Sequence, residues 1–343
     1  MPDDFRLRQD LQRLTLGDYQ LPLGVRETKL KPPVQGYTVR FTEGVGDDPD
    51  TYLFHAVVSH DKLRPLVDAA FNLLPREVTP VIEIGSRDAY RMTDVYLGEE
   101  PLPLVEFLRS WYEFEEILLE DVTIGVGANA EDPWVDVFID TWKGVVISVP
   151  VELRDEVERM LSGLGLSEVE ATWDEQETLA DEEELVSESV LDLSENGPDL
   201  EELLLELRER WLLELNIDRE TNVDEAGRHL GMTLWHAVVF ATSSDGDEAR
   251  GANIVIWMTA GSLAQAEELI EDALLDRPEF VFESIYTMDR VAYDDRPQSL
   301  SHLPHSRRRA AVHEMIIEQW GDRVGEGGKP PEAPGGGGGV GDN

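Results

Sequence analysis

One arrangement of elements recurs along this sequence and constrains its fold more than any other feature. Two strand-like runs joined as a hairpin, followed by an amphipathic helix and a further strand, occur over residues 37–86, 121–173 and 233–293. Short antiparallel connections place the helices on one face of each sheet, where they cover its apolar side. We therefore expect an α+β protein made of two-layer α/β sandwiches of ferredoxin-like type, with antiparallel sheets and helices on one face.

A stretch without lysine or arginine separates the second of these units from the third. Residues 174–198 are rich in aspartate and glutamate and poor in aromatic residues, a composition typical of a solvated linker. We expect this acidic linker to join a first α+β domain (37–173), with two of the units, to a second (199–321), with the third. An N-terminal extension (1–36) precedes them, and the Gly/Pro-rich tail (322–343) is predicted to be disordered.

Three helices are predicted in the second domain. The first covers 199–215, where leucines and Trp211 recur at helical spacing. The second begins after Ser262, whose side chain is expected to cap the helix in a capping box with Gln265. The third covers 306–321, from a run of arginines to a glycine. Together with the strands of the third unit, these helices are expected to complete the second domain.

The chain is strongly acidic, with a formal net charge of −43. Such a surface repels the phosphates of nucleic acids and anionic lipids, so we expect no direct binding to nucleic acid or membrane. The acidity has three interpretations. It can be a solubilising surface from salt adaptation, a face that docks a basic partner protein, or a mimic of nucleic acid that occupies the groove of such a partner.

Other bulk features narrow the class of protein further. No run of apolar residues is long enough to span a membrane, and the first residues lack the apolar segment of a secretory signal, so we expect a cytoplasmic protein. The chain contains no cysteine, which excludes disulfides and thiolate chemistry. Its oligomeric state is left open.

Two similar hexapeptides each contain a histidine. "LFHAVV" (53–58) and "LWHAVV" (234–239) share five of six residues, and both are apolar on both faces of a strand, which is typical of a central strand. His55 and His236 are therefore interpreted as packed histidines satisfied by one hydrogen bond, with a metal ligand or general base as the alternative. Since the first hexapeptide precedes a helix and the second precedes a strand, they are not equivalent positions of one repeat.

The run "WVDVFID" alternates between apolar and mixed residues. It places Trp134, Asp136, Phe138 and Asp140 on one face of a strand, with Trp142 in the adjoining turn. The three aromatic residues are candidates for binding a ligand or a partner; the alternative is a solvated face. The two aspartates are roughly 13 Å apart along the strand, too far for a paired acid and base without help from neighbouring strands.

A loop at 84–94 gathers charge of both signs in an acidic chain. Arg87, Tyr90 and Arg91 are candidate binding residues for an anion, since guanidinium groups suit carboxylates and phosphates. Structural pairing of the arginines with acidic residues of the chain is the alternative interpretation.

No catalytic motif is recognised, neither a nucleophile elbow, nor a Walker loop, nor a zinc-binding H-E-x-x-H. We expect no catalytic residues, no metal and no cofactor, and predict a non-catalytic adaptor or regulatory protein acting through protein–protein interaction. Two alternatives remain. One is an enzyme with a composite site between the sheets (Asp136, Asp140, His55 and Arg87); the other is an acidic nucleic-acid mimic.

Overall fold

The computed structural model describes residues 5–28, 31–44, 46, 49–173, 185–192, 198–245, 250–304 and 309–320. The chain forms two compact units, each continuous in space but not in sequence. Unit 1 consists of Met1–Gly85 and Thr93–Asn216, and unit 2 of Ser86–Met92 and Ile217–Asn343. Among the described residues, no helix is both long and apolar enough to cross a membrane. The predicted disordered tail (322–343) lies outside the described residues.

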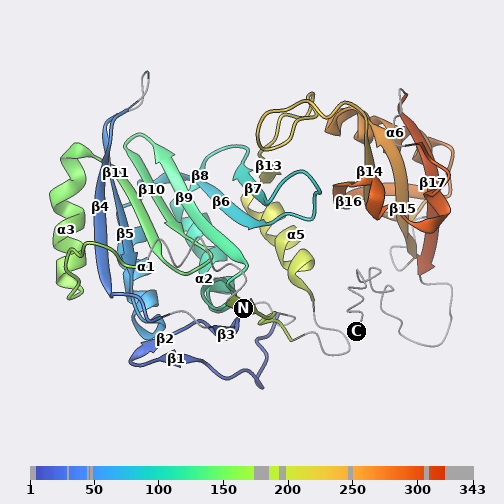
Figure 1. Cartoon of the computed structure of the whole chain (residues 1–343). Coiled ribbons are helices and arrows are strands. Elements are labelled where there is room, and N and C mark those ends of the chain that lie inside the picture. Colours follow the sequence, from blue (N-terminus) through green and yellow to red (C-terminus); the bar gives the residue numbers. More distant parts are fainter. Residues whose placement is uncertain are drawn as a thin grey trace. The chain divides into compact units, whose positions relative to one another are not determined.

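Unit 1 is built on a nine-stranded sheet in the order β13-β7-β6-β9-β10-β11-β5-β4, with β8 paired to β6 off this path (Figure 1). Its strands are β4 (Gly36–Thr42), β5 (Thr51–Val57), β6 (Glu77–Gly85), β7 (Thr93–Gly98), β8 (Leu102–Pro103), β9 (Ile124–Glu131), β10 (Trp134–Ile139), β11 (Val145–Pro150) and β13 (Leu213–Leu215). Two small pairs accompany it: β1 (Thr15–Leu16) with β2 (Tyr19–Gln20), and β3 (Val25–Thr28) with β12 (Leu185–Ser187).

In the described part of unit 1, four α-helices cover one face of this sheet. They are α1 (Leu63–Phe71), α2 (Leu104–Glu120), α3 (Arg154–Gly163) and α5 (Leu200–Trp211), with short 3-10 turns η1 (His60–Lys62) and η2 (Val151–Leu153). All four contribute buried side chains to one core, and its largest members are Trp111 of α2 and Trp211 of α5. The alternation predicted in β10 is observed, since Val135, Val137 and Ile139 are fully buried in this core. The other face of β10 is therefore free to carry polar and aromatic groups.

The described part of the predicted acidic linker and the helix after it belong to unit 1. Residues 174–184 and 193–197 lie outside the described residues, but between them β12 pairs with β3, and Val190 and Leu191 are fully buried in the core of unit 1. The predicted helix at 199–215 is observed as α5, which a capping box at Asp199 begins. Its apolar side packs into unit 1, whereas the sequence places it in a second domain, because β13 continues from it into the nine-stranded sheet.

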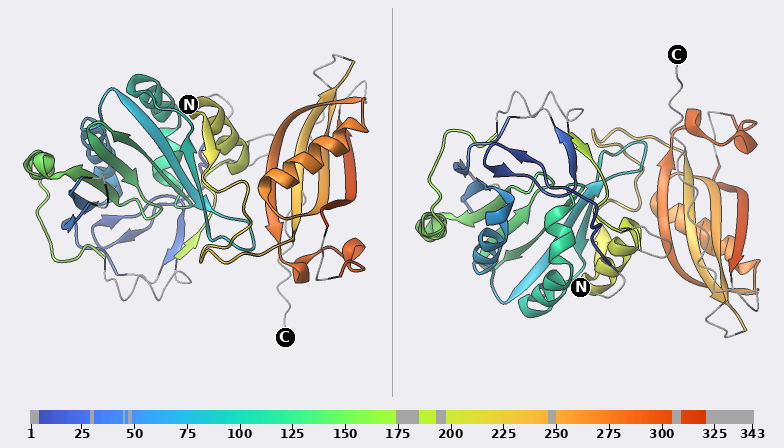
Figure 2. Two further views of the ribbon diagram at one scale, coloured as in Figure 1. Left: turned by 90° about the horizontal axis from the view of Figure 1, so that it is seen from above. Right: turned by 90° about the horizontal axis from the view of Figure 1, so that it is seen from below.

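Unit 2 contains a four-stranded sheet in the order β16-β14-β15-β17, with α6 (Leu263–Leu275) on one face (Figure 2). The strands are β14 (Thr233–Ser243), β15 (Gly251–Ala260), β16 (Phe280–Val291) and β17 (Ala311–Trp320), and two 3-10 turns follow β16: η4 (Tyr293–Asp295) and η5 (Gln298–Leu300). Ser262 caps α6 as predicted, its Oγ accepting from the N–H of Gln265. The Gln265 side chain accepts from Gly261, one residue before the cap.

The prediction of a helix at 306–321 is wrong in the described part of that range. Residues 311–320 form the edge strand β17, paired with β15. A register shift at His313 places Val312 and Met315, three residues apart, on the same side of the sheet. This spacing imitates a helical one. The α+β prediction itself is confirmed, since every pairing between named strands is antiparallel and helices cover one face.

Candidate functional site

The arginine-containing loop singled out in the sequence packs within unit 2. Asp88 is buried there, and its Oδ2 accepts from the backbone N–H of Arg290 (3.0 Å) and from its Nε (2.7 Å). The N–H of Ala89 donates to the carbonyl of Arg290 at 2.9 Å. The loop thus closes the end of the edge strand β16 with backbone and charged contacts, which protects a sheet edge. Asp88 also pairs with Arg91, whose Nη1 lies 3.6 Å from Oδ2, so this arginine of the loop has an acidic partner within the chain.

Arg290 is the centre of a buried polar network. Its Nη1 donates to Asn222 Oδ1 and to the carbonyl of Val223, both at 2.8 Å. The guanidinium lies 5.3 Å from the ring centre of Tyr90 and 5.9 Å from that of Trp235, within the range of cation–π contacts. Tyr90, a candidate binding residue, therefore packs against this network, and burial raises the pKa of its hydroxyl.

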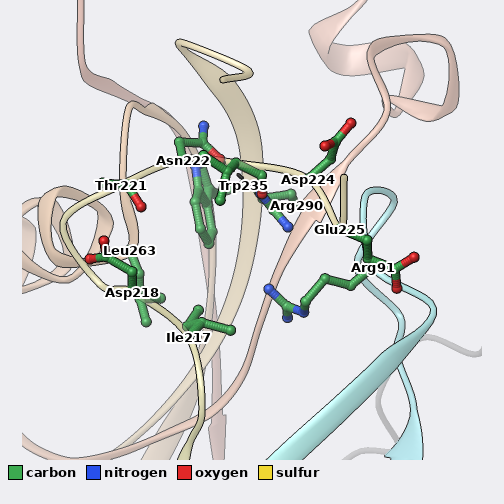
Figure 3. Close-up of a pocket in the computed structure, with 11 residues that line it drawn as sticks. Arg91, Ile217, Asp218, Thr221, Asn222, Asp224, Glu225, Trp235, Leu263 and Arg290 are labelled. Carbon is green, nitrogen blue, oxygen red and sulfur yellow. Dashed lines mark hydrogen bonds between the residues drawn. The ribbon is translucent and has the colours of Figure 1, made fainter. Parts of the chain in front are cut away.

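A pocket of about 170 Å³ lies beside this network, lined by Arg91, Ile217, Trp235, Leu263 and Arg290 among others (Figure 3). Figure 3 shows Arg91 reaching from its loop toward Ile217 and Trp235. Pockets for drug-sized ligands usually exceed about 300 Å³, so this one suits a group of side-chain size.

The acidic groups around the pocket, Asp218, Asp224 and Glu225, accept hydrogen bonds from backbone N–H groups of unit 2. Asp224 accepts from the N–H groups of Ala226 and Arg228. The bond from Arg228 lowers the pKa of the Asp224 carboxyl most, and the bond from Ala226 lowers it further. Glu225 accepts from the N–H of Met92. Because these bonds hold the loop in shape, the pocket offers mainly its apolar wall to a ligand.

Arg87, the third candidate of the loop, is exposed and acts on a histidine. His236 lies on β14 with its ring 4.5 Å from that of Trp257. Burial lowers the pKa of His236, and the positive charge of Arg87 lowers it further. His236 is therefore neutral near pH 7, as expected of a packed histidine rather than a cationic one.

In unit 1, the structure brings together two of the residues proposed for a composite site. His55 Nε2 lies 3.2 Å from Asp140 Oδ2, and both side chains are partly exposed. The other oxygen of Asp140 accepts from the N–H of Gly144 at 2.8 Å, within the turn from β10 to β11. Gly144 permits this contact, because a Cβ there would lie 2.2 Å from His55 Nε2. A carboxylate that orients an imidazole is an arrangement used in general base catalysis.

Asp136 lies on the same face as this pair and interacts with a carboxylate that the sequence did not single out. Burial raises the pKa of Asp136 to about 6, with a further contribution from Glu83 on β6. Burial also raises the pKa of Glu83, and Asp140 adds to it. The negative charges of Glu83 on β6 and of Asp136 and Asp140 on or next to β10 thus interact. The spacing of residues along β10 alone does not predict this interaction.

The three aromatic candidates of unit 1 lie in different surroundings. Trp134 and Phe138 are half-buried on the outer face of β10, and the Phe138 ring lies against Gly125 and Gly127 of β9. Trp142 instead packs edge-on against Trp173, with ring centres 5.4 Å apart. Trp142 therefore belongs to a structural contact of unit 1.

Lys143, next to Trp142, is buried although it is charged. Its Nζ donates to the carbonyl of Ile124 at 2.7 Å, and burial lowers its pKa to about 8 against the opposing effect of Asp121 and nearby carboxylates. Within the described ranges, no group of three histidine, aspartate or glutamate side chains is placed to hold a metal ion.

A further surface, which the sequence did not identify, carries three half-buried aromatic residues in contact with one another. It is the face of the unit 2 sheet opposite α6, here named the open face. At one end, Leu300 and Leu303 cover Leu234. The other end carries six residues that face the same way by strand register and ring contact: Phe240, Asn253, Tyr286, Ile316, Glu318 and Trp320.

The aromatic rings of the open face form a cluster. The ring of Phe240 lies 4.8 Å from that of Tyr286 and 6.3 Å from that of Trp320, the second pair nearly perpendicular. Ile316 on β17 is 44% exposed beside them. Half-buried aromatic rings grouped around an exposed aliphatic side chain are typical of a binding surface. Alternation in β14 and β15 signals such a face, but only the pairing of β16 and β17 assembles it.

Comparison with protein-family models, with curated proteins and with solved structures gives no match for this chain. The functional inference therefore rests on the surfaces described above.

Proposed function

We propose that the chain is a non-catalytic adaptor or regulatory protein whose open face binds an extended segment of a basic partner protein. The observation that carries this proposal is the aromatic cluster of Phe240, Tyr286 and Trp320 on a sheet face that α6 does not cover. Large aromatic side chains at a surface are typical anchors of protein–protein interfaces.

The charge of this sheet favours a cationic occupant. Strands β14 to β17 contain a single lysine or arginine, Arg290, and its guanidinium is buried on the side of α6. The same strands carry four acidic residues, of which Glu318 is exposed on the open face. Because the whole chain has a net charge of −43, this surface attracts a basic segment and repels nucleic acid.

The edge of the sheet favours an extended occupant. Among the described residues, β17 pairs with β15 along one edge and with no strand along the other. A long edge strand with unpaired backbone groups can accept a further strand from a partner. Alternate side chains of such a segment would then point onto the open face, beside Ile316 and Trp320.

Calorimetry with a peptide of alternating lysine and serine, at low and at high salt, tests this proposal. We expect measurable binding at low salt, weakening as salt screens the charges. Phe240→Ala should weaken it at least tenfold. Phe282→Ala is the matched control, since Phe282 is a phenylalanine of the same sheet, 46% exposed, that pairs with Ala241 of the α6 side. Equal loss in both variants, or none in either, would contradict the proposed site.

A second candidate function is supported by the contact of His55 with Asp140. In this alternative the chain is an enzyme, with His55 as general base and Asp136 as the neighbouring acid. The fourth residue of the predicted composite site, Arg87, belongs to unit 2, so unit 1 alone would supply the chemistry. Hydrolysis of p-nitrophenyl acetate that is lost in His55→Gln would favour this candidate; equal rates would count against it.

Two finer predictions stay as proposals beside these. One is the ferredoxin-like type of two separate domains. The other is the nucleic-acid mimic, which requires acidic side chains spaced like phosphates along one face.

A further inference from the structure

Asn253, near the start of β15 on the open face, has an unsatisfied acceptor. The residue is 8% exposed, and no donor of the described residues reaches its Oδ1. Buried side-chain oxygens in folded proteins nearly always accept a hydrogen bond, and leaving one without a donor destabilises the fold. Because no described residue donates to this oxygen, the N–H group of a bound partner can supply the missing hydrogen bond.

The strand register places this oxygen beside the aromatic cluster and a carboxylate. Asn253 pairs directly with Phe240 of β14 on one side and with Glu318 of β17 on the other. Two residues earlier, Gly251 makes room for the ring of Trp320, because a Cβ there would lie 2.5 Å from Trp320 Cζ2. An amide oxygen, a carboxylate and aromatic rings therefore converge on one spot.

This set of groups suits a guanidinium better than an ammonium. A guanidinium is planar, stacks on aromatic rings and donates five N–H groups in a fixed fork, so it can bond an amide oxygen and a carboxylate at once. A lysine ammonium is a compact, strongly hydrated charge that loses more water on entering such a site.

We propose that the open face binds an arginine side chain, whose guanidinium stacks against the Phe240, Tyr286 and Trp320 rings and donates to Asn253 Oδ1 and to Glu318. This inference rests on the proposed function and specifies the residue of the partner that is recognised. Because Oδ1 is enclosed, the Trp320 ring moves off Gly251 as the guanidinium enters.

The test compares peptides of alternating arginine and serine with their lysine and citrulline counterparts by calorimetry. Citrulline keeps the shape of arginine without its charge, and lysine keeps the charge without the planar fork. We expect the arginine peptide to bind at least tenfold more tightly than the lysine peptide, and the citrulline peptide not to bind. Asn253→Leu should remove the preference for arginine, and Glu318→Gln should reduce it.

Asn253→Leu also separates a ligand-binding role from a structural one. Leucine has nearly the same shape and removes an unsatisfied oxygen, so the variant should unfold at the same temperature as the wild type or a higher one. Asn222→Leu is the matched control: Asn222 is equally buried but fully bonded, to Gly231, Thr233 and Arg290, and its loss should lower that temperature. If Asn253→Leu destabilises the protein as much as Asn222→Leu, the oxygen is structural and the proposal is wrong.

The outcomes distinguish this inference from the proposed function. If arginine and lysine peptides bind equally well and Phe240→Ala weakens both, the open face binds basic segments but does not select arginine, and the inference fails alone. If neither peptide binds, both fail. Should Asn253→Leu not fold, Glu318→Gln decides, because Glu318 is exposed and its replacement leaves the core intact. Unchanged selectivity in Glu318→Gln would overturn the inference.

Discussion

Replacing Asp88 by alanine is expected to destabilise unit 2 by about 3–5 kcal/mol, the cost of leaving a buried charge without its partner. The side chain of Asp88 is fully buried and that of Arg290 is 4% exposed, so solvent screens the pair poorly. Once the carboxylate is gone, Arg290 keeps two neutral acceptors, Asn222 Oδ1 and the carbonyl of Val223. These hold its position but do not balance its charge.

The destabilisation can be divided between the charge of Asp88 and its hydrogen bonds, because the two oxygens have different donors. Oδ2 accepts from the backbone and from Nε of Arg290, and Oδ1 accepts from the N–H of Tyr90 at 2.9 Å. Asp88→Asn keeps one oxygen as an acceptor and loses the charge, so a smaller cost of about 2 kcal/mol is expected. The order of stability should therefore be wild type, then asparagine, then alanine.

Hydrogen exchange measured by mass spectrometry is the suitable assay, because two compact units need not unfold in one transition. Peptides from β14 and β16 should exchange faster in Asp88→Ala, while those from β9 and β10 serve as the reference. The double variant Asp88→Ala, Arg290→Met also removes the buried guanidinium of Arg290 and should regain part of the protection; Arg91, which pairs with Asp88 at 3.6 Å, is the same in both variants. If the double variant exchanges faster than Asp88→Ala alone, an uncompensated charge is not the cause and the reasoning is refuted.

Three further predictions concern unit 1. Gly144→Ala should separate His55 from Asp140, because its Cβ would lie 2.2 Å from His55 Nε2, and the loss should appear as a shift of the His55 ring signals in NMR spectra. Asp136 has a pKa raised to about 6, so its ionisation lowers the free energy of unfolding as pH rises from about 4 to above 6. Asp136→Asn should remove this decline, which is worth up to about 3 kcal/mol above pH 7. In urea unfolding, the variant should therefore match the wild type below pH 4 and exceed it above pH 7. Asp199→Ala removes the cap of α5 and should lower the free energy of unfolding of unit 1 by about 1 kcal/mol, again measured by urea unfolding.

Local patterns in the sequence predict the regular elements of this fold well. The alternation in β10 gives its buried face correctly, because a strand's side chains alternate strictly when one face is buried. The cap of α6 at Ser262 is also predictable, since the bond it makes lies within three residues. Both signals depend only on neighbours in the chain.

The failure at β17 has a specific local cause. A bulge at His313 shifts the register by one residue, so Val312 and Met315 both face the core at a spacing of three. With Ile316 following, the pattern matches the apolar face of a helix. A bulge needs a partner strand to define it, and β15 lies fifty residues earlier in the chain, so the sequence pattern alone favours the wrong element.

The candidate sites depend on contacts that no local pattern contains. Asp88 meets Arg290 across 202 positions, and His55 meets Asp140 across 85. The sequence identified Arg87, Tyr90 and Arg91 by composition and missed the partner that orders their loop. Long-range pairs of this kind follow from strand order, and strand order is the least predictable part of a sheet whose hairpins do not follow one another in space.

The two similar hexapeptides show why the same strand sequence does not produce the same site. Both lie in central strands, β5 between β11 and β4, and β14 between β16 and β15, as their two apolar faces predict. In each, the alanine after the histidine is fully buried on the helix side, and the histidine faces away from the helices. The residues that contact each histidine come from other parts of the sheet and differ. His55 contacts the carboxylate of Asp140 beside Gly144, whereas His236 contacts the ring of Trp257. A carboxylate can orient an imidazole for proton transfer, so the enzyme alternative uses His55 of these two histidines, and the effect of His55→Gln on hydrolysis tests it.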